Sequence, residues 1–171
     1  SSDLGGKHLV IAPTEASSVK WSSKPVSSSD TSGSVQISGV TTTGDRKTAL
    51  NDFAGRANTT AIINGSTSSN VTNTNDYAAG FCNKYSRTNA NGKGLTAGRW
   101  WLPSMGEMAM IWANFDKINY ALSKISGATQ LQANWYWTST QTSALNAWNL
   151  YLRVGFMGSN YKFSQSRVRP V

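Results

Sequence analysis

A chain of 171 residues with 39% hydrophobic residues is long enough to bury a core, and its length fits one domain. Only 14% of its residues are charged, whereas Ser, Thr and Asn are abundant, and this polar but uncharged composition favours a β-rich extracellular domain over a cytosolic helical one; the net charge is +8. The single cysteine, Cys82, excludes an internal disulfide, and no apolar run is long enough to span a membrane.

The positive charge is concentrated toward the C-terminus. No Asp or Glu follows Asp116, whereas residues 117–171 contain Lys117, Lys124, Arg153, Lys162, Arg167 and Arg169. A surface of one sign attracts polyanions, so a sulfated glycan could meet Arg153, Lys162 and Arg167. Ordinary solubility charge is an equal alternative, and we expect Arg169 to be structural. The chain has no recognisable nucleic-acid-binding motif, so nucleic acid is not an expected partner.

The N-terminal third predicts two strands separated by a Ser-rich stretch. HLVIA (8–12) is apolar, and SVQISGV (34–40) alternates apolar and polar residues, as a half-buried strand does. Between them, Trp21 and Val26 are the candidate anchors of residues 13–34. A polar loop is expected over residues 64–75.

Three short helices are predicted next, near 76–86, 104–114 and 118–125. Asp76 can cap the first, which has Phe81 and Cys82 on its apolar face. Ser104 and Glu107 form the capping box S-x-x-E at the start of the second. Gly127 can end the third. The side chains expected to be buried are Phe81, Trp100, Leu102, Ile111 and Trp112.

The C-terminal residues change to a strand pattern. WYWTST and AWNLYLRV predict an antiparallel sheet that holds residues 135–140 and 147–153, followed by a short strand at NYKF. Gly155 and Gly158 fit a hairpin turn after the second strand. Alternation places Trp135 and Trp137 on one face and Tyr136 on the other.

The residues needed for catalysis or metal binding are sparse. A catalytic thiol or serine would depend on His8, the only histidine. Glu107 is accounted for by the capping box, and Asp45 and Asp52 alone are a weak basis for a cation site. No cluster of His and Cys suits zinc. The sequence therefore predicts a non-enzymatic protein with no cofactor and no metal.

The segment from Trp135 onward mixes large rigid side chains with small polar ones, as binding loops of antibodies do. After Asn146 it holds too many large groups for a purely solvated face, which favours a binding surface. A second layer of core is the alternative for Phe156 and Phe163. The candidate ligand-binding residues are Asn146, Asn149, Tyr151, Arg153, Phe156, Ser159, Tyr161, Lys162, Phe163, Gln165 and Arg167.

Several blocks in a fixed order carry a resemblance to a known family. They are NDFAGRANT (51–59), AAGFCNKYS (78–86), GRWWLPSMGEM (98–108), INYALSKI (118–125), YWTST (136–140), NAW (146–148) and VRPV (168–171). With these blocks, the chain from about Ala49 to Val171 resembles the family named for the C-terminal domain of the Legionella collagen-like adhesin. That family is similar to the C-type-lectin-like fold and to the fold of formylglycine-generating enzymes.

The resemblance implies an α+β domain of C-type-lectin-like type at residues 49–171, with short helices packed on an antiparallel β-sheet. Residues 1–48 would be an N-terminal extension with strands, packed on that domain. Members of the family are often extracellular, on bacterial surfaces or phage particles, and the resemblance implies ligand contacts from the C-terminal strands and loops. Residues 146–167 resemble a region that diversity-generating retroelements vary.

The resemblance and the composition together predict a ligand-binding or adhesion module for a protein or glycan ligand. A structural or tip subunit of a bacterial surface fibre is one alternative. A relative of the formylglycine-generating enzymes is another, although the cysteines that those enzymes use near their C-terminal part are missing here. The calcium and sugar motifs E-P-N, Q-P-D and W-N-D of C-type lectins are also missing.

Overall fold

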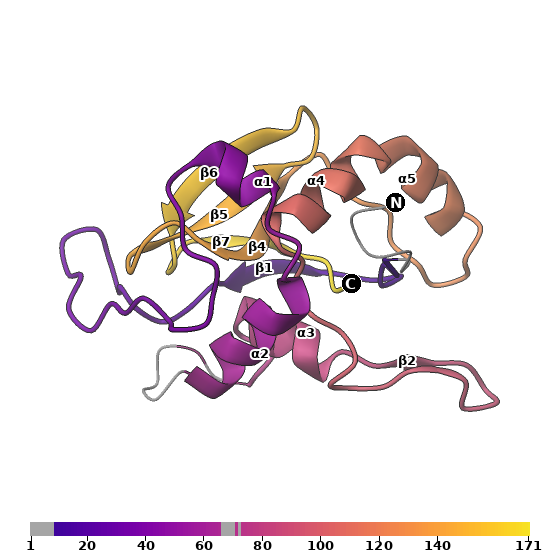
Figure 1. The fold of residues 1–171 in the computed structure, drawn as a ribbon. Helices are drawn as coiled ribbons and strands as arrows, with labels where there is room; N and C mark the ends of the chain where they lie inside the picture. Colours follow the sequence, from indigo (N-terminus) through magenta and orange to yellow (C-terminus); the bar gives the residue numbers. More distant parts are fainter. Residues whose placement is uncertain (1–8, 66–70, 72) are drawn as a thin grey trace.

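The computed structural model describes residues 9–65, 71 and 73–171, and these form an α+β fold around one larger sheet (Figure 1). The helices are α1 (Arg46–Leu50), α2 (Gly55–Gly65), α3 (Ala78–Lys84), α4 (Met105–Ala113) and α5 (Phe115–Leu122). The strands are β1 (Ala16–Lys20), β2 (Arg87–Thr88), β3 (Gly94–Leu95), β4 (Trp135–Gln141), β5 (Asn146–Tyr151), β6 (Phe156–Tyr161) and β7 (Gln165–Val168).

The larger sheet has the order β1-β7-β4-β5-β6, and β2 pairs with β3 in a separate hairpin. β4 and β5 pair antiparallel as expected, and β6 extends them into an antiparallel meander, in which Tyr136 pairs with Leu150 and Leu150 with Met157. β6 begins at Phe156 rather than at the predicted strand 160–163, so Gly155 lies in the turn, whereas the placement of Gly158 in that turn is wrong. The sheet is mixed rather than purely antiparallel, because β7 runs parallel to β4 at the pair Tyr136 and Arg167. This order leaves β6 at one edge and β1 at the other.

Helices cover both faces of the sheet (Figure 1). On one face, α2 and α3 pack against Trp137 and Val168 in a first hydrophobic core. On the other face, α4 and α5 pack against Tyr136 and Leu150 in a second core. Alternate residues of β4 therefore enter different cores, as the period of two in a strand requires. Trp137 and Tyr136 are both fully buried, as their positions on a central strand dictate.

The three predicted helices exist, with different ends. α4 lies within 104–114, and its capping box holds: the Ser104 N–H donates to Glu107 Oε2 at 2.8 Å. α3 lies within 76–86 but begins after Tyr77, so the prediction that Asp76 caps it is wrong. α5 starts at Phe115 and ends at Leu122, before Gly127. Ser123 is the residue at this end, and its hydroxyl donates to the Tyr120 carbonyl.

Two predicted strands are absent from the described chain. Residues 9–12 form no strand, and His8 lies outside the described residues. Residues 34–37 have no regular secondary structure and residues 38–40 form a turn, with φ of +71° at Gly33 and +78° at Gly39. Ile37 has its backbone partners all the same, since its N–H and C=O bond with the side-chain amide of Gln141 at 3.2 and 3.1 Å. A side chain from β4 thus takes the place of a neighbouring strand.

The described part of residues 1–48 packs into the body of the fold. β1 pairs with β7, and Val19, Trp21, Ile37 and Val40 belong to the same core as Trp137. The Trp21 indole donates to the Thr138 carbonyl at 2.9 Å. Within the described residues, none of the helices has both the length and the apolar character needed to cross a membrane.

Of the five side chains expected to be buried, Trp100, Leu102 and Ile111 are buried, with exposures of 4%, 0% and 2%, and Phe81 is half-buried. The prediction for Trp112 is wrong, because it is 41% exposed. Met105, Met108 and Ile111 fill the inner side of α4. Trp112, one residue beyond Ile111, is turned about 100° around the helix and falls at the margin of that side.

Candidate ligand-binding surface

Three aromatic rings gather on the face of the sheet opposite α4, two from the β5–β6 hairpin and one from β4. Tyr151 and Phe156 are cross-strand partners next to the turn, and both contact Trp135 of β4. The Trp135 centroid lies 5.3 Å from that of Tyr151 and 6.0 Å from that of Phe156, with the second pair edge-on. The cluster is not sealed from solvent, since Phe156 is 54% exposed.

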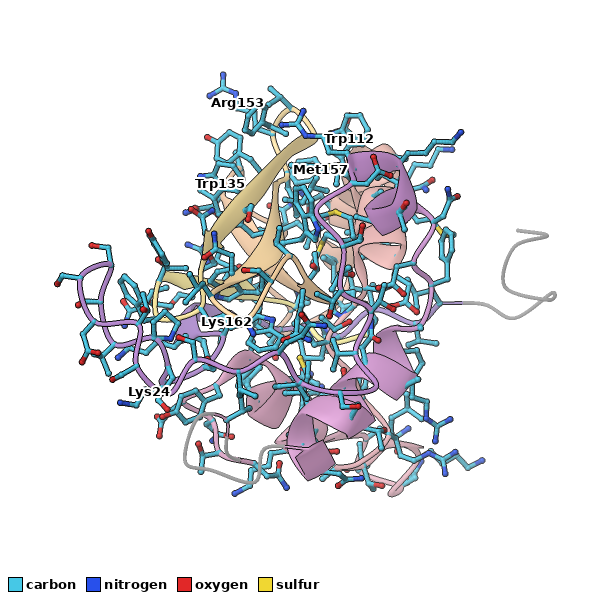
Figure 2. The ribbon with its side chains drawn as sticks, turned by 60° about the vertical axis from the view of Figure 1, so that its left-hand side comes forward. Lys24, Trp112, Trp135, Arg153, Met157 and Lys162 are labelled. Carbon is cyan, nitrogen blue, oxygen red and sulfur yellow. The ribbon has the colours of Figure 1, made fainter. Side chains whose placement is uncertain are left out.

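Trp112 supports the same hairpin from the other side. It extends from α4 to the turn at Gly155, where a Cβ atom would overlap its indole ring. Met157 lies on this α4 side, because its partner Leu150 belongs to the second core. Figure 2 shows Trp112, Trp135 and Met157 gathered toward the hairpin end, with Arg153 projecting from it. We call the exposed or partly exposed group of Trp112, Trp135, Tyr151, Arg153, Val154 and Phe156 the tip patch.

Two arginines give the tip patch a positive border. Arg153 is exposed in the turn between β5 and β6. Arg46, the first residue of α1, places its guanidinium carbon 5.8 Å from the centroid of the Phe156 ring, in cation–π range. Neither arginine forms a salt bridge with any described residue. The patch thus combines large apolar rings with guanidinium groups that are free to pair.

A second group of candidate residues lies at the opposite end of β6. Tyr161 and Phe163 stack with centroids 5.3 Å apart and an interplanar angle of 19°. Ser159 donates to Thr142 Oγ1, and Asn146 is the cross-strand partner of Tyr161. Five strand steps of about 3.4 Å place Tyr161 roughly 17 Å from Phe156. The candidates on the hairpin therefore form two separate groups rather than one site.

Two candidates point into the protein. Asn149 is 1% exposed and accepts from Asn160 Nδ2 at 2.9 Å. Lys162 is also 1% exposed; its ammonium lies 4.6 Å from the centroid of the Trp21 ring and donates to Gln141 Oε1 and the Val35 carbonyl. Figure 2 shows Lys162 inside the fold, well away from Arg153. The expectation that Lys162 is a surface cation for sulfate is wrong.

Burial lowers the pKa of the Lys162 ammonium to about 7. Its two oxygen acceptors and the Trp21 ring oppose this shift, since they favour the charged form. The buried amine of Lys162, directly after β6, thus connects the end of this strand to the segment 21–40 through its contacts with Val35 and Trp21. Its role in this structure is to hold that segment in place.

The last two candidates, Gln165 and Arg167, lie on β7, which β4 and β5 separate from β6. Gln165 is exposed and accepts from Ser18 of β1. Arg167 pairs with Glu15 at 2.8 Å, so it is not a free cation. Arg169 is fully buried and pairs with the same carboxylate at 2.8 Å, as expected for a structural residue. Of the three cations proposed to meet sulfate, Arg153 alone is exposed and unpaired.

The remaining chemistry-bearing residues serve the fold. Burial raises the pKa of the Cys82 thiol, which disfavours a thiolate. Burial also raises the pKa of Glu107, whose carboxylate caps α4 and accepts from the Trp101 indole. Asp52 is buried and accepts from Thr140 and Asn58. No group of three or more His, Cys, Asp or Glu side chains gathers among the described residues.

No protein-family model matches this chain, and no curated protein is significantly similar to it in sequence. Sequence reasoning found Tyr151, Arg153 and Phe156 but missed Trp112 and Arg46, which come from distant helices. The position of Trp112 at the edge of the apolar stripe of α4 could have indicated that it is partly exposed. Nothing in the sequence around Arg46 indicated a place near the hairpin.

Proposed function

We propose that this protein is a non-enzymatic, extracellular ligand-binding or adhesion module of the C-type-lectin-like type, and that it binds through the tip patch. The observation that carries the proposal is the exposure of several large apolar side chains at one end of the sheet. Trp112, Val154 and Phe156 are 41%, 61% and 54% exposed and converge on the same hairpin turn. Contiguous apolar exposure of this kind is typical of interaction sites.

The composition of the patch supports recognition of a macromolecule. Trp, Tyr and Arg are the residues most often found to dominate the binding energy of protein interfaces. Trp112, Trp135 and Tyr151 supply rigid rings with few rotatable bonds, and Arg46 and Arg153 can pair with acidic groups. This mixture suits a protein ligand, or a glycan whose sugar faces stack on the rings.

The hairpin is held firmly enough to act as a rigid platform. Gly155 fits against Trp112 on one side of the hairpin, and a Cβ atom on Gly158 would lie 2.7 Å from Trp135 on the other. β5 is paired along its length with β6, and its half next to the turn, residues 149–151, is also paired with β4. Preorganisation of this kind lowers the entropy that a binding surface loses when its ligand arrives.

The family resemblance adds a reason why this end of the molecule would bind. The stretch from Asn146 to Arg167, which resembles a diversified region, includes the whole β5–β6 hairpin. Exposed positions there, such as Arg153, Val154 and Phe156, lie outside both cores, so we expect substitutions at them to leave the cores intact. Gly155 and Gly158 do not, because each is packed against a tryptophan.

Sequencing the same locus in related strains tests the proposal. We expect substitutions to concentrate at the partly exposed position 151 and the exposed positions 153, 154, 156, 159 and 161, with Gly155 and Gly158 unchanged. Even drift over the whole surface would contradict diversified binding and favour a structural subunit of a surface fibre. Screening the wild-type protein against glycan arrays and surface proteins of neighbouring cells then provides a ligand.

Variants of the exposed residues locate the contact with that ligand. Phe156→Ser and Arg153→Ala should each weaken binding at least tenfold. Ile125→Ser is the matched control, because Ile125 is 49% exposed and follows α5 rather than the hairpin. Equal affinity of the wild type and both tip variants would place the ligand elsewhere and reject the tip patch as its site.

A further inference from the structure

A groove separate from the tip patch lies between the N-terminal segment, at Leu9 and Ile11, and the helices α4 and α5. Its volume is about 380 Å³, within the range of small-molecule sites. Six aliphatic side chains form its walls: Leu9, Ile11, Met110, Ile111, Ile118 and Ala121. None of its lining residues belongs to the tip patch, so a ligand here would be independent of the one proposed above.

The walls of this groove are fixed by the fold. On the N-terminal side, the Ala12 N–H donates to the Pro170 carbonyl, and the Pro13 carbonyl accepts from Thr129. The buried Arg169 also donates to the Ala12 carbonyl at 2.9 Å. On the other side, α4 and α5 meet at Asn114, which caps both helices. The groove is thus formed before any ligand arrives.

The polar residues of the groove are Asn114 and Lys117. The Asn114 amide already donates to the Met110 carbonyl at 2.9 Å. Lys117 is exposed and forms no ion pair with any described residue. It stands one helical turn from Ala121 on the same side of α5, so its ammonium can stay in water at the rim while its stem covers apolar surface.

We propose that this groove binds a medium-chain fatty acid, with the alkyl chain between the helices and the carboxylate at Lys117. The apolar part of the lining is aliphatic and offers no ring to stack on, which favours a flexible chain over an aromatic ligand. At roughly 30 Å³ for each water-sized group, the volume holds about a dozen of them. The single unpaired cation at one border complements a single carboxylate.

Titration of the methyl-labelled full chain with sodium decanoate, below its micelle concentration, tests the proposal. The NMR signals of the Met110, Ile111 and Ile118 methyl groups should shift in a saturable manner. Ala121→Trp should abolish these shifts, since the larger ring fills the groove from an exposed position. Ala113→Trp is the matched control, because Ala113 is an exposed alanine of α4 that does not line the groove.

Lys117→Met keeps the apolar stem and removes the charge, and it provides a second test should Ala121→Trp misfold. It should weaken decanoate binding about two- to fivefold, the range of an exposed ion pair, and leave the affinity for 1-decanol unchanged. Absence of saturable shifts in the wild type, or equal decanoate affinity of the wild type and Lys117→Met, would overturn the proposal. The proposal would also be overturned if the protein did not bind decanoate but bound phosphatidylcholine vesicles, and if Ala121→Trp blocked that binding.

Discussion

Gly155 and Trp112 share a space that has room for only one of their side chains. Gly155 turns the chain between β5 and β6 with a φ of +71°, and any Cβ atom at this position would overlap the Trp112 indole. A residue of the turn and a residue of α4, 43 positions apart in sequence, thereby fix how the hairpin meets the second core.

Replacing Gly155 by alanine should therefore destabilise the protein for two reasons. The left-handed conformation costs an L-residue about 1–2 kcal/mol, and the overlap with Trp112 adds a further cost of about 1–3 kcal/mol. Urea denaturation measures the sum. In a Trp112→Ala background, the part of the cost that comes from the overlap should disappear. If Gly155→Ala lowered the unfolding free energy by the same amount in both backgrounds, the overlap with Trp112 would not be a cause of the destabilisation.

Glu15 is expected to be the most sensitive acidic residue for folding. Its carboxylate pairs with the fully buried Arg169 and the partly buried Arg167, and it accepts from the Tyr136 hydroxyl at 2.8 Å. Burial and this neighbouring carboxylate together raise the pKa of Tyr136. Glu15→Ala leaves a buried guanidinium without its counter-ion, which should cost about 3–5 kcal/mol of unfolding free energy.

Arg167→Met is the control for this ion pair. Its side chain is 23% exposed, so the loss of its salt bridge should cost about 1 kcal/mol or less. Thermal unfolding of the two variants compares them directly. Similar losses in both would mean that Arg169 is satisfied by its backbone acceptors, the Ala12 and Thr129 carbonyls, without Glu15.

The parts of the fold that the sequence predicts are those with local signals. The capping box of Ser104 and Glu107 places the start of α4, and alternation in WYWTST sends Tyr136 and Trp137 into different cores. Both features depend on residues within a few positions of one another. Trp112 was misplaced because the apolar pattern across 108–115 runs through two helices, which break at Asn114.

The features that escaped prediction depend on distant partners. Residues 34–40 have the alternation of a strand, yet the partner of Ile37 is the Gln141 side chain, 104 positions away. Lys162 looked like a surface cation because nothing near it in sequence reveals the Trp21 ring or the Val35 carbonyl. The sequence also indicated which residues could contact a ligand. Only the structure of the β5–β6 hairpin shows that they lie in two groups at opposite ends of β6.

Lys162 should make stability depend on pH just above neutrality. Its pKa is about 7 in the folded protein and near 10.5 when unfolded, so the unfolded chain binds more protons between these values. Stability should therefore rise as pH increases from 7 to 8.5. The upper limit lies below 9.0, the ordinary pKa of the Cys82 thiol, so most of that thiol stays protonated in the unfolded chain over the measured range.

The Lys162→Met variant isolates this effect. Methionine fills similar space but does not titrate, so the rise in unfolding free energy between pH 7 and 8.5 should shrink. The variant also differs from the wild type in its stability at any one pH, because Gln141 Oε1 and the Val35 carbonyl lose their donor. The test therefore compares the change in unfolding free energy with pH, not its absolute value. Parallel pH profiles of the wild type and the variant would show that Lys162 keeps an ordinary pKa in the folded state.

Asp52 and Asp45 are both helix-flanking acids, and they should differ sharply in their contribution to stability. Asp52 is 5% exposed, and its carboxylate accepts from the Ala54 N–H, Asn58 Nδ2 and Thr140 Oγ1 at 2.7–2.9 Å. Asp52→Ala leaves these donors buried without an acceptor, which should cost at least about 2 kcal/mol. Asp45 is exposed and caps α1 through Thr48, so Asp45→Ala should cost only about 1 kcal/mol. Asp52 therefore links the start of α2 to β4 inside the protein, whereas Asp45 acts on one short helix. Equal midpoints of urea denaturation for the two variants would contradict this distinction.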